Sequence, residues 1–195
     1  SFRDVISDIP TVAIPDDHDV YQGNIWGDAG NKSPEGNRWK DGGYTEPPAF
    51  INMVQRTMCG NLPDPYDPTP VAQGIGVYYT DLNYGGVSFA ILEDRKFKSV
   101  PGAKGPDLKL LGDRQIDFLE DWTASWQEET MFKVAMTQTL FAGVHTVYGK
   151  INRDEDTNGW PVEGRNRALQ TLRKGFAFTI GGDQHLATVV RHGVD

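Results

Sequence analysis

Apolar residues along the chain follow two periodicities, one typical of helices and one typical of strands. Helical spacing, at every third or fourth residue, predicts helices in residues 1–9, 46–59, 113–126 and 162–174. Short apolar runs bounded by turn residues predict strands in residues 11–14, 75–80, 87–92, 132–137, 176–185 and 186–190. Because the strands alternate with helices, the pattern predicts a layered α/β domain.

The helix boundaries and faces follow from the same pattern. Thr45 is the expected N-cap of the first long helix, with Pro in its first turn, and Gly60 its expected end. Gly175 is the expected end of the last helix. The predicted helix faces are Phe50, Met53, Val54 and Met58, then Ile116, Leu119, Trp122 and Trp126, then Arg165, Leu169 and Leu172.

The stretch from Ile9 to Trp26 is the first place where chemistry is expected. Its apolar run, Thr11 to Ile14, leads directly into a cluster of charged side chains, namely Asp16, Asp17, His18 and Asp19. Open α/β sheets place ligand chemistry at the carboxyl ends of their strands, so this cluster is a candidate metal or acid–base site. A polar turn whose charges face water is the alternative.

A second cluster follows the last predicted long strand. Gly181 and Gly182 allow a tight turn, and Asp183 and His185 come next. In an extended segment, residues two apart point the same way, so these two side chains can converge on one ion. Carboxylate oxygen and imidazole nitrogen together suit Mn, Fe or Zn, and further oxygen ligands would suit Ca. Ordinary turn residues are the alternative here too.

Other candidate motifs are weaker. The run from Asp154 to Gly159 matches the first half of a calcium loop, but its twelfth position is Arg165 rather than Glu, so a solvated loop is favoured. His145 has no adjacent carboxylate, which favours a structural role. Cys59 has no neighbouring His in the sequence and is a minor candidate for a nucleophile. Paired carboxylates for glycoside hydrolysis stay open.

Length and charge narrow the possibilities further. The 195 residues fit one domain or part of a larger one. A formal net charge of −8 argues against non-specific binding to nucleic acid and is compatible with cation binding. With a single cysteine, no disulfide can form within the chain. No apolar run approaches the length of a transmembrane helix.

Several motifs resemble, in order, those of one known family. The DDHD run, followed by Asn24 and Trp26, resembles the DDHE segment of the PhoD-like alkaline phosphatases, members of the calcineurin-like metallophosphatase superfamily. VSFAILEDRKFK resembles the family's strand carrying D-x-R, and LGDRQIDFLEDW resembles its LG-x-x-Q-x-x-W-L helix. KVAMTQTLF resembles K-x-x-x-S-Q-x-P-F, NGWPVEGRNRAL resembles D-x-W-x-G-Y-x-x-x-R-x-x-L, and IGGDQH resembles L-S-G-D-x-H.

The resemblance implies a fold and an activity. The expected fold is α/β, a layered β-sandwich flanked by helices in four αββα layers. The expected activity is metal-dependent hydrolysis of a phosphate monoester or diester, with two divalent or trivalent ions (Ca, Fe, Mn or Zn) activating a water. The family's usual export suggests a secreted or periplasmic protein.

The resemblance also implies roles for individual residues. His18 corresponds to the catalytic histidine, which donates to the leaving group or a phosphate oxygen. The expected metal ligands are Asp17, Asn24, Asp183 and His185. The residues expected to support these ligands or contact the substrate are Asp16, Asp19 and Arg165.

Part of the superfamily's site has no counterpart in the sequence. The first ligand motifs, D-x-H and G-D-x-x-[DY], normally precede the DDHD-type segment, yet only fifteen residues precede Asp16. Residues 1–195 are therefore expected to form a single domain that is the C-terminal portion of a PhoD-like domain, unable alone to assemble the two-metal site. A non-catalytic module of the same fold, binding a ligand or partner, is the alternative function.

Overall fold

The computed structural model describes residues 4, 6–20, 27–33, 42–141, 146–151, 155, 159–183 and 187–191. They form a mixed α/β fold, as the sequence predicts. Its helical elements are α2 (Asp17–Val20), η1 (Asp28–Gly30), α3 (Pro48–Cys59), η2 (Ala72–Gly74), α4 (Asp94–Phe97), α5 (Gly112–Ala124) and α6 (Val162–Lys174). Its strands are β1 (Thr80–Tyr84), β2 (Val87–Ile91), β3 (Phe132–Thr137), β4 (Thr146–Val147), β5 (Lys150–Ile151) and β6 (Phe178–Gly181).

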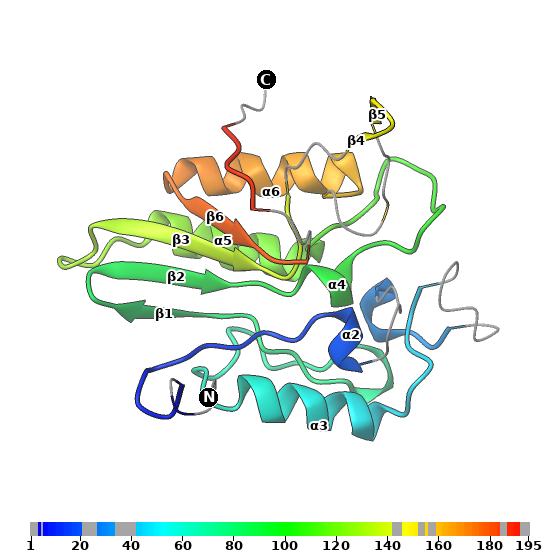
Figure 1. The fold of residues 1–195 in the computed structure, drawn as a ribbon, viewed down its shortest axis with the longest axis horizontal. Helices are drawn as coiled ribbons and strands as arrows, with labels where there is room; N and C mark the ends of the chain where they lie inside the picture. Colours follow the sequence, from blue (N-terminus) through cyan, green and yellow to red (C-terminus); the bar gives the residue numbers. More distant parts are fainter. Residues whose placement is uncertain are drawn as a thin grey trace.

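The centre of the fold is a four-stranded sheet with the order β1-β2-β3-β6. β1 and β2 form an antiparallel hairpin, whereas β3 runs parallel to both β2 and β6. The carboxyl ends of β2, β3 and β6 therefore lie at one edge of the sheet, toward α4 in Figure 1. β4 and β5 form a separate two-stranded ladder.

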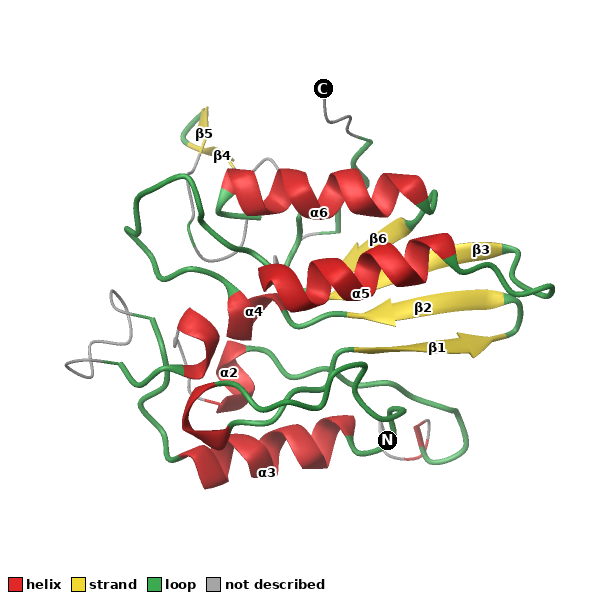
Figure 2. Cartoon of the chain, turned by 180° about the vertical axis from the view of Figure 1, so that it is seen from behind, coloured by secondary structure: helices red, strands yellow, loops and turns green. Residues whose placement is uncertain are grey.

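Helices α5 and α6 lie against the same face of the sheet, in front of it in Figure 2 and behind it in Figure 1. Their apolar side chains form the main core with the alanines of β2 and β3. This core includes Ile116, Leu119, Trp122, Leu169 and Leu172 together with Ala90 and Ala135. The predicted faces of these two helices are thus confirmed at their central positions, while Trp126 lies beyond the end of α5 and is 47% exposed.

Helix α3 lies on the other side of the molecule. Ile51 is its most deeply buried apolar residue and packs with Tyr44, Ile75 and Val20. Phe50 and Met53, which the sequence places on the buried face, are exposed, because the helix turns Ile51 toward the core instead. Thr45 makes no capping hydrogen bond, and Pro47 is the N-cap residue.

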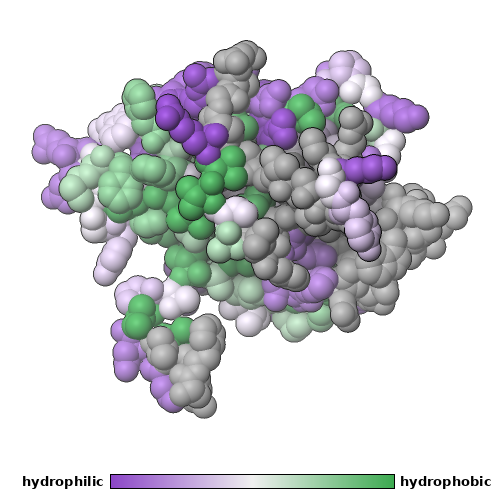
Figure 3. All heavy atoms as spheres, turned by 45° about the horizontal axis from the view of Figure 1, so that its top comes forward, coloured by the Kyte–Doolittle hydropathy of each residue, from purple (hydrophilic) through white to green (hydrophobic). Residues whose placement is uncertain are grey.

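The open side of the sheet is apolar near its β6 edge. Phe178 and Ile180 are exposed on β6, and the Phe178 ring lies 6.3 Å from that of Phe132, centroid to centroid. Apolar side chains are visible as green areas on the face of the molecule drawn in Figure 3. Among the described residues, no helix is both long and apolar enough to span a membrane.

Local patterns in the sequence predicted the bounds of several helices and strands correctly. The observed β3 and α6 have the predicted bounds, and β2 differs from its prediction by one residue. The turn between β1 and β2 is formed by Gly85 and Gly86, both at positive φ.

Two predicted strands are wrong. Residues 75–79 are extended but outside the sheet, since the N–H groups of Tyr78 and Tyr79 donate to the buried carboxylate of Glu93 rather than to a strand. Residues 11–14 also form no strand. Pro10 and Pro15 on either side of that run lack N–H donors for a ladder.

The end of the chain differs as well. β6 ends at Gly181, and residues 187–190 lie outside the sheet with Val189 fully exposed. A predicted strand there is therefore wrong.

Candidate metal centre

The candidate site lies at the edge of the sheet where β2, β3 and β6 end. Arg95 follows β2 in the short helix α4, Gln138 follows β3, and Asp183 follows β6. The segment of Asp16 and Asp17 is brought to the same place at the start of α2, which lies next to α4 in Figures 1 and 2. Asp16, Asp17 and Asp183 therefore lie at the same edge of the sheet, although residues 11–14 are not a strand.

Three carboxylates converge at this edge. Oxygens of Asp16, Asp17 and Asp183 all lie within 4.8 Å of one another. The side chains of Asp17 and Asp183 retain 7% and 17% of their exposure, and that of Asp16 retains 25%. The cluster is thus largely shielded from water but still open on one side, as a site that exchanges an ion with solvent must be.

Arg95 is the cation at the centre of this cluster, and its side chain is fully buried. Nε lies 2.7 Å from Oδ1 of Asp16. Nη2 lies 3.5 Å from Oδ1 of Asp17 and 3.4 Å from Oδ1 of Asp183. One guanidinium therefore contacts carboxylates that lie more than 160 residues apart in the sequence.

The polar groups next to Arg95 are joined to one another by hydrogen bonds. Asp94 is buried and accepts hydrogen bonds from the backbone N–H groups of Gln138 (3.1 Å) and Thr139 (3.4 Å) and from the Thr139 hydroxyl. Gln138 in turn bonds to the backbone of Arg95 and of Pro15. This network fixes the loops after β2 and β3 and the segment before α2 relative to one another.

The cluster changes the acidity of its members. Burial raises the pKa of Asp17 above its usual range, although attraction to Arg95 opposes the shift. Burial also raises the pKa of Asp183 to about 6, with repulsion from Asp16 and Asp17 contributing. Burial alone would lower the pKa of Arg95, but the carboxylates outweigh it and raise that pKa. Asp17 and Asp183 are thus harder to ionise here than in water because their pKa values are raised, while the raised pKa of Arg95 keeps its guanidinium charged.

His18 and Asp19 lie at the rim of this cluster. Nε2 of His18 is 3.7 Å from Oδ2 of Asp17, and the imidazole is 62% exposed, so it is accessible to a bound molecule. The carboxylate of Asp19 accepts a hydrogen bond from the backbone N–H of Asp16 at 2.8 Å and so braces the turn that presents the cluster.

Other predicted site residues are elsewhere or outside the described residues. Arg165 lies in α6, where its guanidinium contacts the side-chain oxygen of Asn166 at 3.4 Å. The predicted ligands Asn24 and His185 lie outside the described residues, as do His145 and most of the run from Asp154 to Gly159.

Sequence analysis assigned no role to two residues that lie at this site. Arg95 and Gln138 lie within the motif matches EDRKFK and TQTLF, but a charged or amide side chain gives no sign in the sequence that it will be buried. Their position just after β2 and β3 was the available signal.

The donor set fits a hard cation. Carboxylate oxygens from both ends of the chain converge at one point, and the three negative charges exceed the one positive charge of Arg95. Such oxygen donors suit Ca²⁺ or Mn²⁺ and, with an added imidazole, Zn²⁺ or iron.

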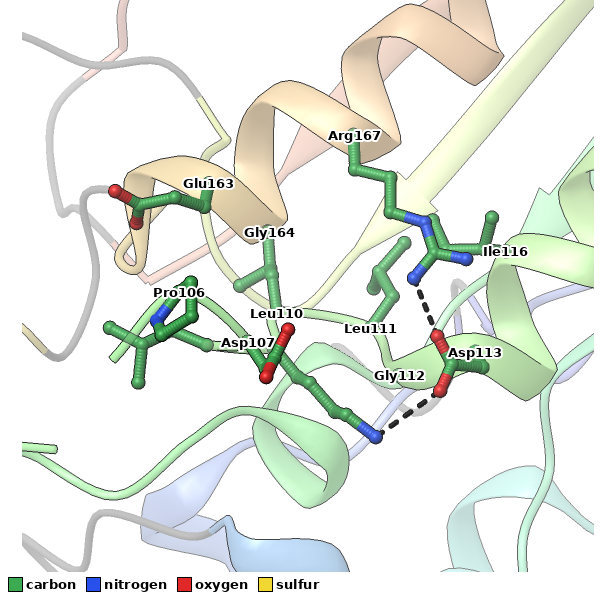
Figure 4. Close-up of a pocket in the computed structure, with 12 residues that line it drawn as sticks. Pro106, Asp107, Leu110, Leu111, Gly112, Asp113, Ile116, Glu163, Gly164 and Arg167 are labelled. Carbon is green, nitrogen blue, oxygen red and sulfur yellow. Dashed lines mark hydrogen bonds and ion pairs between the residues drawn. The ribbon is translucent and has the colours of Figure 1, made fainter. Parts of the chain in front are cut away.

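A separate pocket lies on another part of the molecule. It has a volume of about 540 Å³ and lies between the chain before α5 and the first turn of α6 (Figure 4). Asp113 links two cations there, with its carboxylate 3.2 Å from Nζ of Lys109 and 2.5 Å from Nη1 of Arg167. The lining of this pocket includes none of the three clustered carboxylates.

Comparison with known proteins supports the fold. No protein-family model matches the sequence, and no curated protein matches it either. A solved structure described as "Structure of PhoD" is similar over 87% of this chain, with a TM-score of 0.59 and 20% sequence identity. The match covers 33% of that structure, so this chain spans a third of its length. The chain therefore has a PhoD-like fold, as its motifs predict.

Proposed function

We propose that residues 1–195 are the C-terminal portion of the catalytic domain of a PhoD-like, metal-dependent phosphoric ester hydrolase. The observation that carries this proposal is the convergence of Asp16, Asp17 and Asp183 within 4.8 Å at the carboxyl ends of parallel strands. The PhoD-like fold and the ordered motifs support it.

In this proposal Asp17 and Asp183 hold a cation, with Asp16 beside them. Asn24 and His185 are proposed as further ligands on the same segments of the chain. A bound cation would supply Lewis-acid stabilisation of phosphate oxygens and a water of lowered pKa. Without a cation, three carboxylates would repel a phosphate ester, so cation binding and substrate binding should be linked.

His18 is the proposed catalytic residue. Its imidazole is exposed beside Asp17, and this accessibility supports the assignment. A protonated imidazole can donate a hydrogen bond to a phosphate oxygen or a proton to the leaving oxygen.

The test combines binding and turnover. Mn²⁺ and Ca²⁺ binding is measured by calorimetry on residues 1–195. Hydrolysis of p-nitrophenyl phosphate and bis-p-nitrophenyl phosphate is followed, with and without EDTA, for the full-length parent protein that carries these residues. We expect Asp17→Asn and Asp183→Asn to weaken binding at least tenfold, and His18→Ala to preserve binding but lower turnover. Asp117→Asn, an exposed carboxylate on α5, is the matched control.

The outcomes separate the candidate functions. Cation binding without hydrolysis of either ester would favour the non-catalytic module over the enzyme. Hydrolysis that EDTA leaves unchanged would contradict a metal mechanism. Binding that survives both Asp17→Asn and Asp183→Asn would show that the site is wrongly assigned.

A further inference from the structure

We propose that Arg95 is a positioning residue that assembles the carboxylate cluster and sets its charge, so that these carboxylates take one divalent cation rather than two. This inference rests on the proposed function, because it concerns how the same carboxylates receive their cation. It assigns a role to a side chain that the fold buries completely.

The first argument is geometric. The guanidinium of Arg95 is fully buried and contacts Asp16, Asp17 and Asp183 at once, at 2.7, 3.5 and 3.4 Å. A guanidinium offers donors in a rigid planar fork, so it fixes the directions of the groups that it binds. Arg95 thereby holds the carboxylate after β6 next to the two carboxylates at the start of α2.

The second argument concerns what holds Arg95 itself. Its backbone N–H donates to Oε1 of Gln138 at 3.0 Å. The carboxylate of the adjacent Asp94 accepts a hydrogen bond from the backbone N–H of Gln138, just after β3, at 3.1 Å. The backbone N–H of Lys98 also donates to the carbonyl of Asp94 at 2.9 Å, which closes the turn of α4. The backbone of Arg95 is therefore fixed to the edge of the sheet.

The third argument is one of charge. Three carboxylates and one guanidinium leave two net negative charges, which a single divalent cation neutralises. A second divalent cation on the same groups would leave two net positive charges in a largely buried place, which is unfavourable.

The contacts of Arg95 also leave one oxygen of Asp17 toward the rim. Arg95 contacts Oδ1 of Asp17, at 3.5 Å, and Oδ1 of Asp183, at 3.4 Å. Oδ2 of Asp17 lies 3.7 Å from Nε2 of the exposed His18 imidazole.

The test compares a divalent with a trivalent ion. Ca²⁺ stoichiometry is measured by calorimetry and Tb³⁺ binding by its luminescence, for the wild-type chain, Arg95→Met and Arg95→Lys. We expect the wild type to bind one Ca²⁺. Arg95→Met raises the cluster's charge to three net negatives, so the ratio of Tb³⁺ to Ca²⁺ affinity should rise by about tenfold or more. Arg95→Lys keeps the positive charge, so its ratio of Tb³⁺ to Ca²⁺ affinity should stay close to that of the wild type.

The ratio is informative because a general loss of structure lowers both affinities together. Circular dichroism and thermal unfolding in EDTA establish which variants fold. If Arg95→Met unfolds, Arg95→Gln replaces it, since it also removes the charge but keeps amide donors toward the carboxylates. Its ratio of Tb³⁺ to Ca²⁺ affinity should rise in the same direction, and an unchanged ratio would overturn the inference.

The failures are distinguishable. If the wild type binds Ca²⁺, Asp17→Asn abolishes binding and Arg95→Met leaves the ratio unchanged, the role of Arg95 is refuted and the proposed function stands. Two Ca²⁺ per wild-type chain, both lost in Asp17→Asn, would also overturn the inference. A wild-type chain that binds no cation would overturn the proposed function and this inference with it.

Discussion

The backbone N–H of Arg95 donates a hydrogen bond to Oε1 of Gln138 at 3.0 Å, and the amide nitrogen of the same Gln138 side chain donates to the carbonyl of Pro15. One buried side chain thus joins the ends of β2 and β3 to the residue before the acidic cluster. Because Pro15 directly precedes Asp16, Gln138 links the sheet to the candidate site.

Gln138→Ala should therefore destabilise the fold and the site together. The change leaves a buried N–H and a buried carbonyl without their partner, so the free energy of unfolding should fall by about 2–4 kcal/mol. Urea denaturation measures this loss, and calorimetry should show weaker Ca²⁺ binding. Gln127→Ala, at an exposed position after α5, should change the stability by less than about 0.5 kcal/mol. Equal stability of the two variants would contradict the role of Gln138.

Asp94→Asn should be destabilising although the two side chains have nearly the same shape. The carboxylate of Asp94 accepts from the N–H groups of Gln138 and Thr139 and from the Thr139 hydroxyl, and an amide nitrogen would face one of these donors. We expect a loss of about 2–3 kcal/mol in the free energy of unfolding. The exposed Asp117→Asn variant serves as the control in the same denaturation series. A loss no larger than that of the control would show that these bonds add little.

The sequence predicted those parts of the fold whose signal is local. α6 and β3 each have an apolar pattern that packs against the main core in the expected way, so their bounds were predicted correctly. Residues 75–79 have the same apolar character as a strand, but Glu93, a distant buried carboxylate, binds their N–H groups. No local pattern contains that partner.

The sequence singled out the acidic side chains of the candidate site but not the arginine among them. Asp17 and Asp183 were singled out because each follows an apolar run, although the run before Asp17 forms no strand. Arg95 was not singled out, because an arginine side chain is expected at the surface. Its burial here depends on carboxylates from both ends of the chain. The tertiary structure alone brings these groups together.

Lys133 presents a further buried charge with a testable role. It lies on β3, and its Nζ donates to the carbonyls of Trp122 and of Ser125, the latter at 2.5 Å, where α5 ends. A cation at a helix C-terminus satisfies free carbonyls and interacts well with the helix dipole. Lys133→Met should lower the free energy of unfolding by about 1.5–3 kcal/mol. Lys174→Met removes an exposed ion pair with Glu120 and should cost less than about 1 kcal/mol.

The stability that Lys133 confers should also depend on pH. Burial lowers the pKa of Lys133 below its ordinary 10.5, so between the folded and unfolded values the unfolded chain binds more protons. The free energy of unfolding of the wild type, relative to Lys133→Met, should therefore rise with pH as the pH approaches 10.5. Denaturation of both proteins at several pH values between 8 and about 10.5 measures this difference. A difference that falls with pH would contradict the burial of the charge.

Cys59 should be unreactive in the folded protein. Its thiol is buried near the end of α3, with Sγ 3.7 Å from the carbonyl oxygen of Ala13, and burial raises its pKa to about 12. Because the thiolate is the reactive form, alkylation by iodoacetamide at pH 8 should be at least about a hundredfold slower than for an exposed thiol. Mass spectrometry measures the rate, with Ser125→Cys in a Cys59→Ser background as the exposed control. Urea should bring the two rates together, since unfolding exposes Cys59. Equal rates in the folded state would refute the buried position and, with it, the packing of residues 11–14 against α3 that keeps Asp16 and Asp17 at the sheet edge.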